Sequence, residues 1–328
     1  MIFVNYCSLK GYGDNMISKR KVVIIGAGHV GSHVAMALCF QGNCDEIVFI
    51  DKDTEKALSN CLDISDACLF TPSTTKIRVG GYNECKDADI IIISVGIPRK
   101  PGQTRLDLLD ESGDMIKDVA DKLKPVDYKG IIISITNPAD IIGYYLQKHL
   151  NMPRTRCFST GTYLDTARLK RTVEELSETD RKSIDAFSMG EHGNSSFVTF
   201  SSMTVGAKKY SLMKKESGNN LCDDVILEKT RSIGNEIIEG KGSTEFGIGA
   251  ACADMCKAIF HDEKRVMPAS VLLEGEYGMS DVACGVPCVI GKNGIEKIIE
   301  LPLDENEQNL LKKSCEIIKE NTKRIEKD

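Results

Sequence analysis

The sequence has no apolar run long enough to cross a membrane. The longest runs, such as the one from Ile90 to Val95, are far shorter than the roughly 18 residues that a membrane-spanning helix needs. Residues 1–20 contain no apolar stretch of the length found in a secretory signal. We therefore expect a cytoplasmic protein, with residues 1–20 as an N-terminal extension outside the folded domains.

Long basic runs are also missing, and the 48 acidic residues outnumber the 42 Lys and Arg residues to give a formal charge of −6. This balance argues against nucleic acid as the main partner. Hydrophobic residues make up 41% of the 328 positions and charged residues 27%, as in ordinary globular proteins. At roughly 100–200 residues per domain, the length predicts one large or two medium domains.

The thirteen cysteines do not have the spacing of a disulfide framework or of a zinc knuckle. Their number is odd, their spacing is irregular, and several lie in apolar segments, which indicates buried, reduced thiols. Two CxxxC pairs, Cys252/Cys256 and Cys284/Cys288, suggest zinc, but CxxC spacing is missing and Pro287 interrupts the second pair. We expect no metal site.

Short β-branched runs alternate with helix-length segments from Lys21 to about Thr160, without internal repeats or low-complexity linkers. We predict strands at Val22–Ile25, Glu46–Ile50, Ile77–Val79, Ile90–Ser94 and Ile131–Ile135, and helices at His29–Gln41, Thr54–Cys68, Arg105–Leu123 and Ala139–His149. This alternation implies right-handed crossovers and a doubly wound parallel sheet of an α/β protein.

After about Thr160, long helical segments surround shorter strands, which predicts a second, α+β domain. The predicted helices are Tyr163–Leu176, Asp223–Glu239, Thr244–Phe260 and Glu305–Lys323. The predicted strands lie near Ala186–Met189, Phe197–Ser201, Val266–Leu273 and Val282–Ile290. We therefore expect an α/β domain at residues 21–160 and an α+β domain at residues 161–328.

A G-x-G-x-x-G motif, made by Gly26, Gly28 and Gly31, directly follows the first predicted strand. The three glycines permit a tight turn, close approach of a pyrophosphate to the backbone, and close helix–strand packing. Asp51 follows 20 residues after Gly31, where a carboxylate binds a ribose hydroxyl and repels the 2′-phosphate of NADP. The combination predicts NAD as the cofactor. His29 and His33 have the spacing of a metal pair, but with no third ligand apparent we interpret them as helix-surface histidines.

A second group of polar residues is typical of a catalytic site. His192 lies in the glycine-flanked turn Gly-Glu-His-Gly-Asn-Ser, after an apolar strand. Asp165 and Arg168 are three residues apart and project from neighbouring positions of a helix. Arg105 follows a loop rich in turn formers that begins after Val95, where a doubly wound sheet binds its ligands.

Residues 21 to about 325 resemble the lactate/malate dehydrogenase family. The resemblance rests on GxGxxG, the Pro-Gly-x-x-Arg loop, Thr-Asn-Pro at 136–138, Leu-Asp-Thr-Ala-Arg at 164–168 and Gly-Glu-His-Gly at 190–193, in that order. Gly161-Thr162, the segment 190–195 and Lys-Gly-Ser-Thr at 241–244 are most similar to the bacterial L-lactate and L-2-hydroxyisocaproate dehydrogenase branch.

The resemblance implies a catalytic role for three residues and a binding role for Arg168. His192 would give a proton to the keto oxygen, and Asp165 would orient its imidazole and stabilise the protonated form. Arg168 would hold the substrate carboxylate in a bidentate pair. Arg105 would polarise the carbonyl from a closing loop.

The resemblance also implies contacts around the cofactor and the subunits. Asn137 would contact the substrate or the nicotinamide ribose, Thr244 would line the substrate pocket, and Ile248 would pack on the nicotinamide ring. NADH would supply the hydride. The family further implies that residues 21–160 form an NAD-binding Rossmann domain and residues 161–328 a substrate-binding and catalytic domain. It also implies a homodimer or a homotetramer.

The choice of 2-oxo acid stays open between pyruvate, oxaloacetate and 2-oxoisocaproate. In the family, the residue six positions before the loop arginine reads the substrate side chain, as Gln in lactate enzymes and Arg in malate enzymes. Here it is Arg99. An unpaired guanidinium beside the methyl group of pyruvate costs several kcal/mol, which favours oxaloacetate unless Arg99 turns outward. The branch motifs favour pyruvate, so we expect an enzyme of L-lactate dehydrogenase type with malate activity as the alternative.

Two further alternatives concern regulation and catalysis. Many bacterial lactate dehydrogenases bind fructose 1,6-bisphosphate through an Arg and a His, whose positions here are Lys170 and Asp185. A carboxylate at the second position repels phosphate, so we expect no activation by the bisphosphate.

A non-catalytic NAD-binding sensor is the alternative to an enzyme. It predicts the loss of a catalytic residue, and all of them are present.

Overall fold

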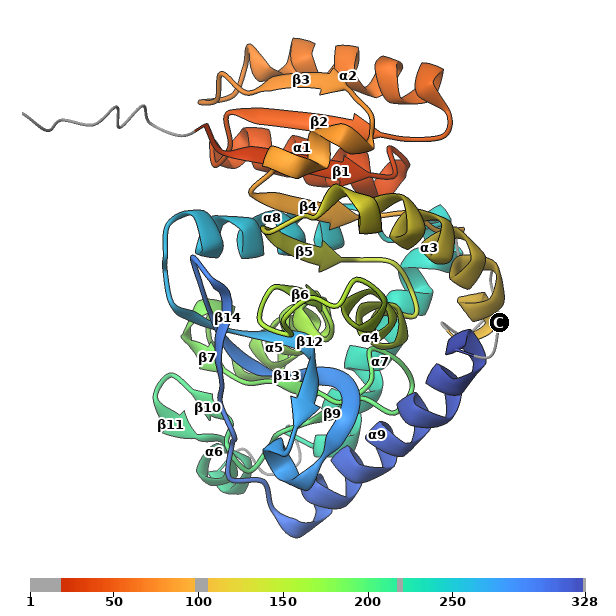
Figure 1. Ribbon diagram of the computed structural model, residues 1–328. Helices are drawn as coiled ribbons and strands as arrows, with labels where there is room; N and C mark the ends of the chain where they lie inside the picture. The colour runs from red at the N-terminus through yellow and green to blue at the C-terminus, as the bar shows by residue number, and fades with distance from the viewer. Residues whose placement is uncertain (1–18, 98–105, 217–220, 327–328) are drawn as a thin grey trace, which may run out of the picture.

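The computed structural model describes residues 19–97, 106–216 and 221–326 (Figure 1). Its first half alternates strands and helices as the sequence predicts. The elements are β1 Lys21–Ile25, α1 His29–Gln41, β2 Glu46–Ile50, α2 Thr54–Cys68, β3 Lys76–Val79, β4 Ile90–Ile93, α3 Leu109–Leu123, β5 Ile131–Ser134, α4 Ala139–His149 and β6 Cys157–Ser159. Short 3-10 turns lie at Tyr82–Asp87, Leu106–Leu108 and Lys124–Val126.

The six strands of this half are parallel, in the order β3-β2-β1-β4-β5-β6. This order reverses at the β1/β4 boundary, which is the dinucleotide-binding crevice of a Rossmann fold. Strand β4 consists of four isoleucines that are all fully buried, because helices cover both faces of the sheet. The predicted α/β Rossmann fold is confirmed.

The second half packs longer helices around antiparallel strands. The elements are α5 Tyr163–Ser177, β7 Ile184–Asp185, β8 Ser188–Met189, β9 Phe197–Val198, β10 Thr204–Val205, β11 Lys208–Lys209, α6 Tyr210–Glu216, α7 Asp223–Lys241, α8 Phe246–Phe260, β12 Arg265–Glu274, β13 Ser280–Gly291, β14 Gly294–Ile298 and α9 Glu305–Glu326, with 3-10 turns at Arg181–Ser183 and Glu276–Gly278. Strand β12 pairs antiparallel with β6 at Ser270 and Ser159. One nine-stranded sheet therefore continues across both halves.

The structure corrects two helix boundaries. The helix predicted to begin at Arg105 begins at Leu109 after a 3-10 turn, and Arg105 lies outside the described residues. The helix predicted from Thr244 begins at Phe246, because Gly242 ends α7 at a φ of 88° and residues 242–245 form a connecting loop. Strands β6, β7, β10, β11 and β14 and helix α6 were not predicted.

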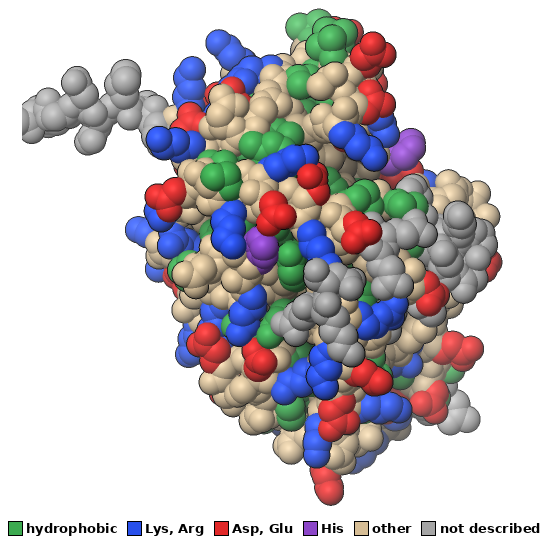
Figure 2. Space-filling view, turned by 45° about the vertical axis from the view of Figure 1, so that its right-hand side comes forward, with side chains coloured by type: hydrophobic (Ala, Val, Ile, Leu, Met, Phe, Trp, Pro, Cys, Tyr) green, Lys and Arg blue, Asp and Glu red, His purple; other side chains and the backbone are tan. Residues whose placement is uncertain are grey.

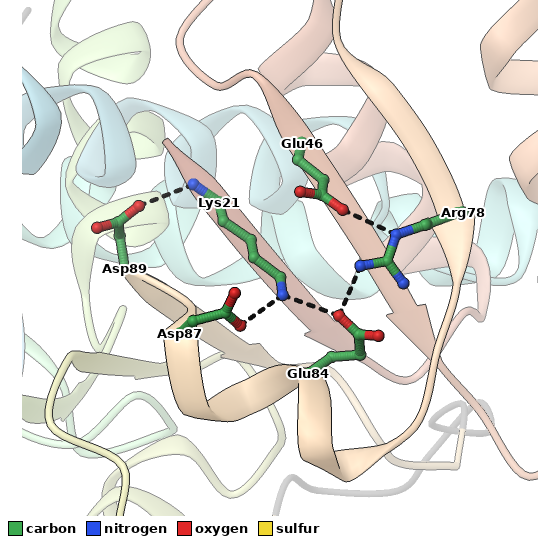
Figure 3. Close-up of polar contacts among 6 residues, drawn as sticks. All are labelled: Lys21, Glu46, Arg78, Glu84, Asp87 and Asp89. Carbon is green, nitrogen blue, oxygen red and sulfur yellow. Dashed lines mark hydrogen bonds and ion pairs between the residues drawn. The ribbon is translucent and has the colours of Figure 1, made fainter. Parts of the chain in front are cut away.

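An ion-pair network ties the amino ends of the parallel strands together (Figure 3). The Lys21 ammonium is 2.8 Å from Glu84 and 2.6 Å from Asp87, although Lys21 is only 5% exposed. Arg78 shares the Glu84 carboxylate and also binds Glu46 at 2.8 Å. The network satisfies a buried charge at the end of the sheet opposite the glycine motif, so its role is structural.

The surface carries charges of both signs. On the face in Figure 2, the basic and acidic side chains of the described residues are interspersed. None of the helices in the described part of the chain combines the length and the apolar character that a membrane span requires.

Candidate active site

The three motif glycines lie where β1 turns into α1, and each has a different steric environment. Gly26 has a φ of 103°, and a Cβ there would come 2.6 Å from the carbonyl oxygen of Ser94. A Cβ on Gly31 would come 2.0 Å from the carbonyl oxygen of Gly26. A Cβ on Gly28 would meet nothing within 4 Å, because Gly28 lines an open cavity. The turn thus needs glycine at two positions, and the third leaves room for a ligand at the amino end of α1.

Asp51 follows the last residue of β2 and faces this glycine turn. Its Oδ2 accepts a hydrogen bond from the Ala27 N–H over 2.6 Å, and its Oδ1 accepts one from the Asp53 N–H over 2.9 Å. The carboxylate therefore holds the glycine turn next to the end of β2. That is the position at which a carboxylate meets the adenosine ribose in this fold.

His192, Asp165 and Arg168 come together, as the sequence predicts. Nδ1 of His192 is 2.6 Å from Oδ2 of Asp165, and Nη1 of Arg168 is 3.0 Å from Oδ1 of the same carboxylate. The side chains are 11%, 13% and 7% exposed, respectively. Asp165 and Arg168 belong to the first two turns of α5, and His192 to the turn that follows β8. A titratable imidazole and a guanidinium are thus fixed by one largely buried carboxylate.

Hydrogen bonds to two buried acidic residues fix the turn that carries His192. Oδ2 of Asp140, on α4, accepts a hydrogen bond from the His192 N–H over 2.8 Å. Burial of Asp140, which is 2% exposed, raises its pKa to about 7. Glu191 is also buried and accepts hydrogen bonds from the N–H and the Oγ of Ser195. These contacts fix the backbone of the turn, and with it the direction of the imidazole.

A single cavity of about 270 Å³ joins the glycine turn to the histidine cluster. Gly28 lines one end, and His192 and Arg168 line the other. Asn137, Thr244 and Ile248 also line it. Oδ1 of Asn137 is buried with no hydrogen-bond partner among the described residues. The cavity thus brings a glycine turn, an imidazole and a guanidinium together, and these residues fit NAD and a small acid.

Two predicted site residues, Arg99 and Arg105, lie outside the described residues. The loop that contains them connects β4 to the 3-10 turn at Leu106–Leu108. Gly96, Ile97 and Leu108, which flank it, line the cavity.

Sequence reasoning missed several cavity residues. His29, which we interpreted as a helix-surface residue, is exposed but lines the cavity, and so does Lys56 of α2. Asp140 was also missed, because an Asp inside an apolar helix pattern gives no signal until its partner turn is known. The four cysteines of the CxxxC pairs are buried and free, and no cluster in the described part of the chain has the ligands for a metal ion.

Comparisons with known proteins agree with this geometry. Residues 20–159 match the family model described as lactate/malate dehydrogenase, NAD binding domain, and residues 162–328 match lactate/malate dehydrogenase, alpha/beta C-terminal domain. The chain is 42% identical over 307 residues to the L-lactate dehydrogenase of Fusobacterium nucleatum, covering 93% of this chain and 96% of that protein.

Solved structures give the same result. A Cryptosporidium parvum lactate dehydrogenase, complexed with lactic acid and nicotinamide adenine dinucleotide, has a TM-score of 0.91 at 28% identity, covering 95% of this chain and 100% of that one. The malate dehydrogenase of the same organism has a TM-score of 0.89 at 29% identity, covering 94% and 99%.

The chain therefore belongs to the lactate/malate dehydrogenase family. Within this family it is an NAD-dependent 2-hydroxy acid dehydrogenase of the L-lactate dehydrogenase type.

Proposed function

We propose that this enzyme reduces pyruvate to L-lactate with NADH, and catalyses the reverse reaction. The observation that carries the proposal is the contact of one carboxylate, Asp165, with both His192 and Arg168 at the wall of a cavity that also contains Gly28. The pairing provides a proton donor and a carboxylate anchor beside a cofactor turn. Loss of NADH absorbance with pyruvate, compared with NADPH under the same conditions, tests both the reaction and the cofactor preference.

The cofactor is proposed to lie along the cavity from Asp51 and the glycine turn to Asn137 and Ile248. Bound there, NADH supplies a hydride to the carbonyl carbon of the substrate. The glycine turn would bind the pyrophosphate through backbone N–H groups at the amino end of α1. Asn137 would donate to or accept from the ribose or the substrate through its buried amide, and Ile248 would give the nicotinamide ring an apolar surface.

The substrate is proposed to lie between Arg168 and His192. Arg168 would form a bidentate pair with the substrate carboxylate, which is the geometry a guanidinium favours. With Nδ1 directed at Asp165, Nε2 of His192 would give its proton to the keto oxygen as that oxygen gains charge. Asp165 would stabilise the positive charge that His192 carries before it gives up this proton, and Thr244 would line the substrate pocket. Arg105 would polarise the carbonyl.

Malate dehydrogenase activity is the second candidate, and Arg99 is the residue that favours it. A guanidinium at this position would pair with the second carboxylate of oxaloacetate, whereas pyruvate would leave it unpaired. The relatives described above carry the names of both lactate and malate enzymes. Direct comparison of the two acids therefore decides the assignment.

We further propose that the bisphosphate does not activate the enzyme. Lys170 on α5 is partly buried, and burial lowers its pKa while the charge of Asp185 on β7 acts to raise it. The Asp185 carboxylate therefore opposes the positive charge of Lys170, which is the only cation at these two positions that could bind a phosphate. We also propose that the enzyme is a homodimer or a homotetramer and that it lies in the cytoplasm. The boundary between its two domains is proposed to lie near residue 160.

A further inference from the structure

The loop between α7 and α8 forms part of the proposed substrate pocket. Gly242, Ser243 and Thr244 all line the cavity, and the next residue, Glu245, precedes the first residue of α8. Gly242 ends α7 in a conformation that most residues avoid, and the Glu245 side chain of this loop reaches helix α1 at His29 and His33. The contacts of Glu245 with the cofactor half of the molecule are therefore important.

The Glu245 carboxylate lies close to the nitrogen atoms of three basic side chains. Its Oε2 is 3.3 Å from Nζ of Lys241 and 3.8 Å from Nε2 of His33, and its Oε1 is 3.9 Å from Nδ1 of His29. Ser243 donates a hydrogen bond to Oε1. The Glu245 side chain is only 13% exposed. The Ser243 hydrogen bond is the main cause that lowers the pKa of Glu245, and the Lys241 and His29 charges add to it.

These contacts join the loop to the helix that begins at the phosphate-binding turn. His29 is the first residue of α1, and His33 lies one turn further along. The start of α8 is packed on the same helix. The Phe246 ring is 4.7 Å from the His33 ring, and a Cβ on Gly249 would come 3.0 Å from the carbonyl carbon of His33. The apolar contacts hold α8 on α1. Glu245 instead connects α1 to the loop residues that line the cavity.

We propose that Glu245 is a positioning residue for substrate binding, which holds Ser243 and Thr244 in place through its contacts with His29, His33 and Lys241. The proposal rests on the proposed function, because it assigns Thr244 to the substrate pocket. The proposal links the two ends of the cavity. Helix α1, whose amino end would bind the cofactor's phosphates, would also position the loop that contacts the 2-oxo acid. Loss of Glu245 then weakens substrate binding while the cofactor site stays intact.

The test compares Glu245→Ala and Glu245→Gln with Glu228→Ala, a control at an exposed position of α7. For Glu245→Ala we expect the KM for the 2-oxo acid to rise about three- to tenfold, as for the loss of a partly buried charge network. The kcat and the Kd of NADH, measured by fluorescence titration without substrate, should change by less than about twofold. Glu245→Gln keeps the acceptor for Ser243 and should recover part of the KM. Glu228→Ala should match the wild type.

Two results would contradict the proposal. An unchanged KM in Glu245→Ala shows that the loop needs no anchor on α1, and a Kd of NADH that rises as much as the KM assigns Glu245 to the cofactor site. Should the alanine variant not fold, the isosteric Gln variant carries the same test, with a smaller expected rise in KM. A wild-type enzyme that reduces none of the tested 2-oxo acids refutes the proposed function instead, and this result is separate because it needs no variant.

Discussion

Nδ1 of His192 is 2.6 Å from Oδ2 of Asp165, although the two residues are 27 positions apart in the chain. The contact joins the turn after β8 to the first turn of α5. It determines which ring nitrogen faces the carboxylate and therefore which one is left for the proposed proton exchange with the substrate. Because Arg168 binds the other oxygen of Asp165, one carboxylate positions both the proposed proton donor and the proposed carboxylate anchor.

Replacing His192 tests the proton donor. In His192→Asn, turnover of the 2-oxo acid should fall by about 10²- to 10⁴-fold, the usual loss when a general acid is removed. The Kd of NADH should stay within about twofold, since the glycine turn is untouched. Steady-state kinetics and fluorescence titration give the two numbers. Turnover close to that of the wild type would show that the proton comes from another group.

Arg99 tests the choice of substrate side chain. In Arg99→Gln, the ratio of kcat/KM for pyruvate to that for oxaloacetate should rise at least about tenfold, because an amide no longer pairs with the second carboxylate. Lys100→Gln removes the neighbouring positive charge and serves as the control, with a ratio close to the wild-type value. An unchanged ratio in Arg99→Gln would mean that Arg99 points away from the substrate.

Residue patterns predict the local parts of this structure, and the family resemblance predicts the contact of Asp165 with His192, but other long-range contacts could not be predicted. The strand Ile90–Ile93 and the turn at Gly26 follow from short patterns with direct steric meaning. The contact of Asp140 with the His192 N–H depends on the packing of α4 beneath a turn 52 residues later, which no local pattern encodes. The sequence predicts Thr244 as the first residue of a helix, but α8 begins at Phe246 and Thr244 lies in the loop that lines the cavity.

The network around Lys21 predicts acid-sensitive stability. The hydrogen bonds from Arg78 and Lys21 lower the pKa of Glu84 to about 2. A depressed carboxyl pKa stabilises the folded protein above the pKa of the unfolded chain, and the contribution disappears as the pH falls toward 2. Glu84→Gln should therefore lower the free energy of unfolding by about 1–2 kcal/mol at neutral pH.

The difference between wild type and Glu84→Gln should shrink as the pH is lowered from about 5 to about 3. Urea unfolding at several pH values measures it, with Asp63→Asn on the exposed face of α2 as the control. A difference that stays constant over this range would show that the charge of Glu84 does not contribute.

Asp185 predicts the response to a bisphosphate. Substrate-saturation curves with and without millimolar fructose 1,6-bisphosphate should superimpose, because the carboxylate beside Lys170 repels the ligand's negative charges. A several-fold fall in the half-saturating concentration of the 2-oxo acid would contradict this expectation and would indicate that another basic residue binds the phosphates.

The most direct test of the account is a comparison of kcat/KM for pyruvate, oxaloacetate and 2-oxoisocaproate, measured in parallel with the wild-type enzyme and NADH. The account predicts NADH-dependent reduction with pyruvate as the best substrate and oxaloacetate as the nearest competitor. A clear preference for oxaloacetate would assign the enzyme to malate, with Arg99 as the deciding residue. No reduction of any of the three acids would contradict the central claim that His192, Asp165 and Arg168 form a working active site.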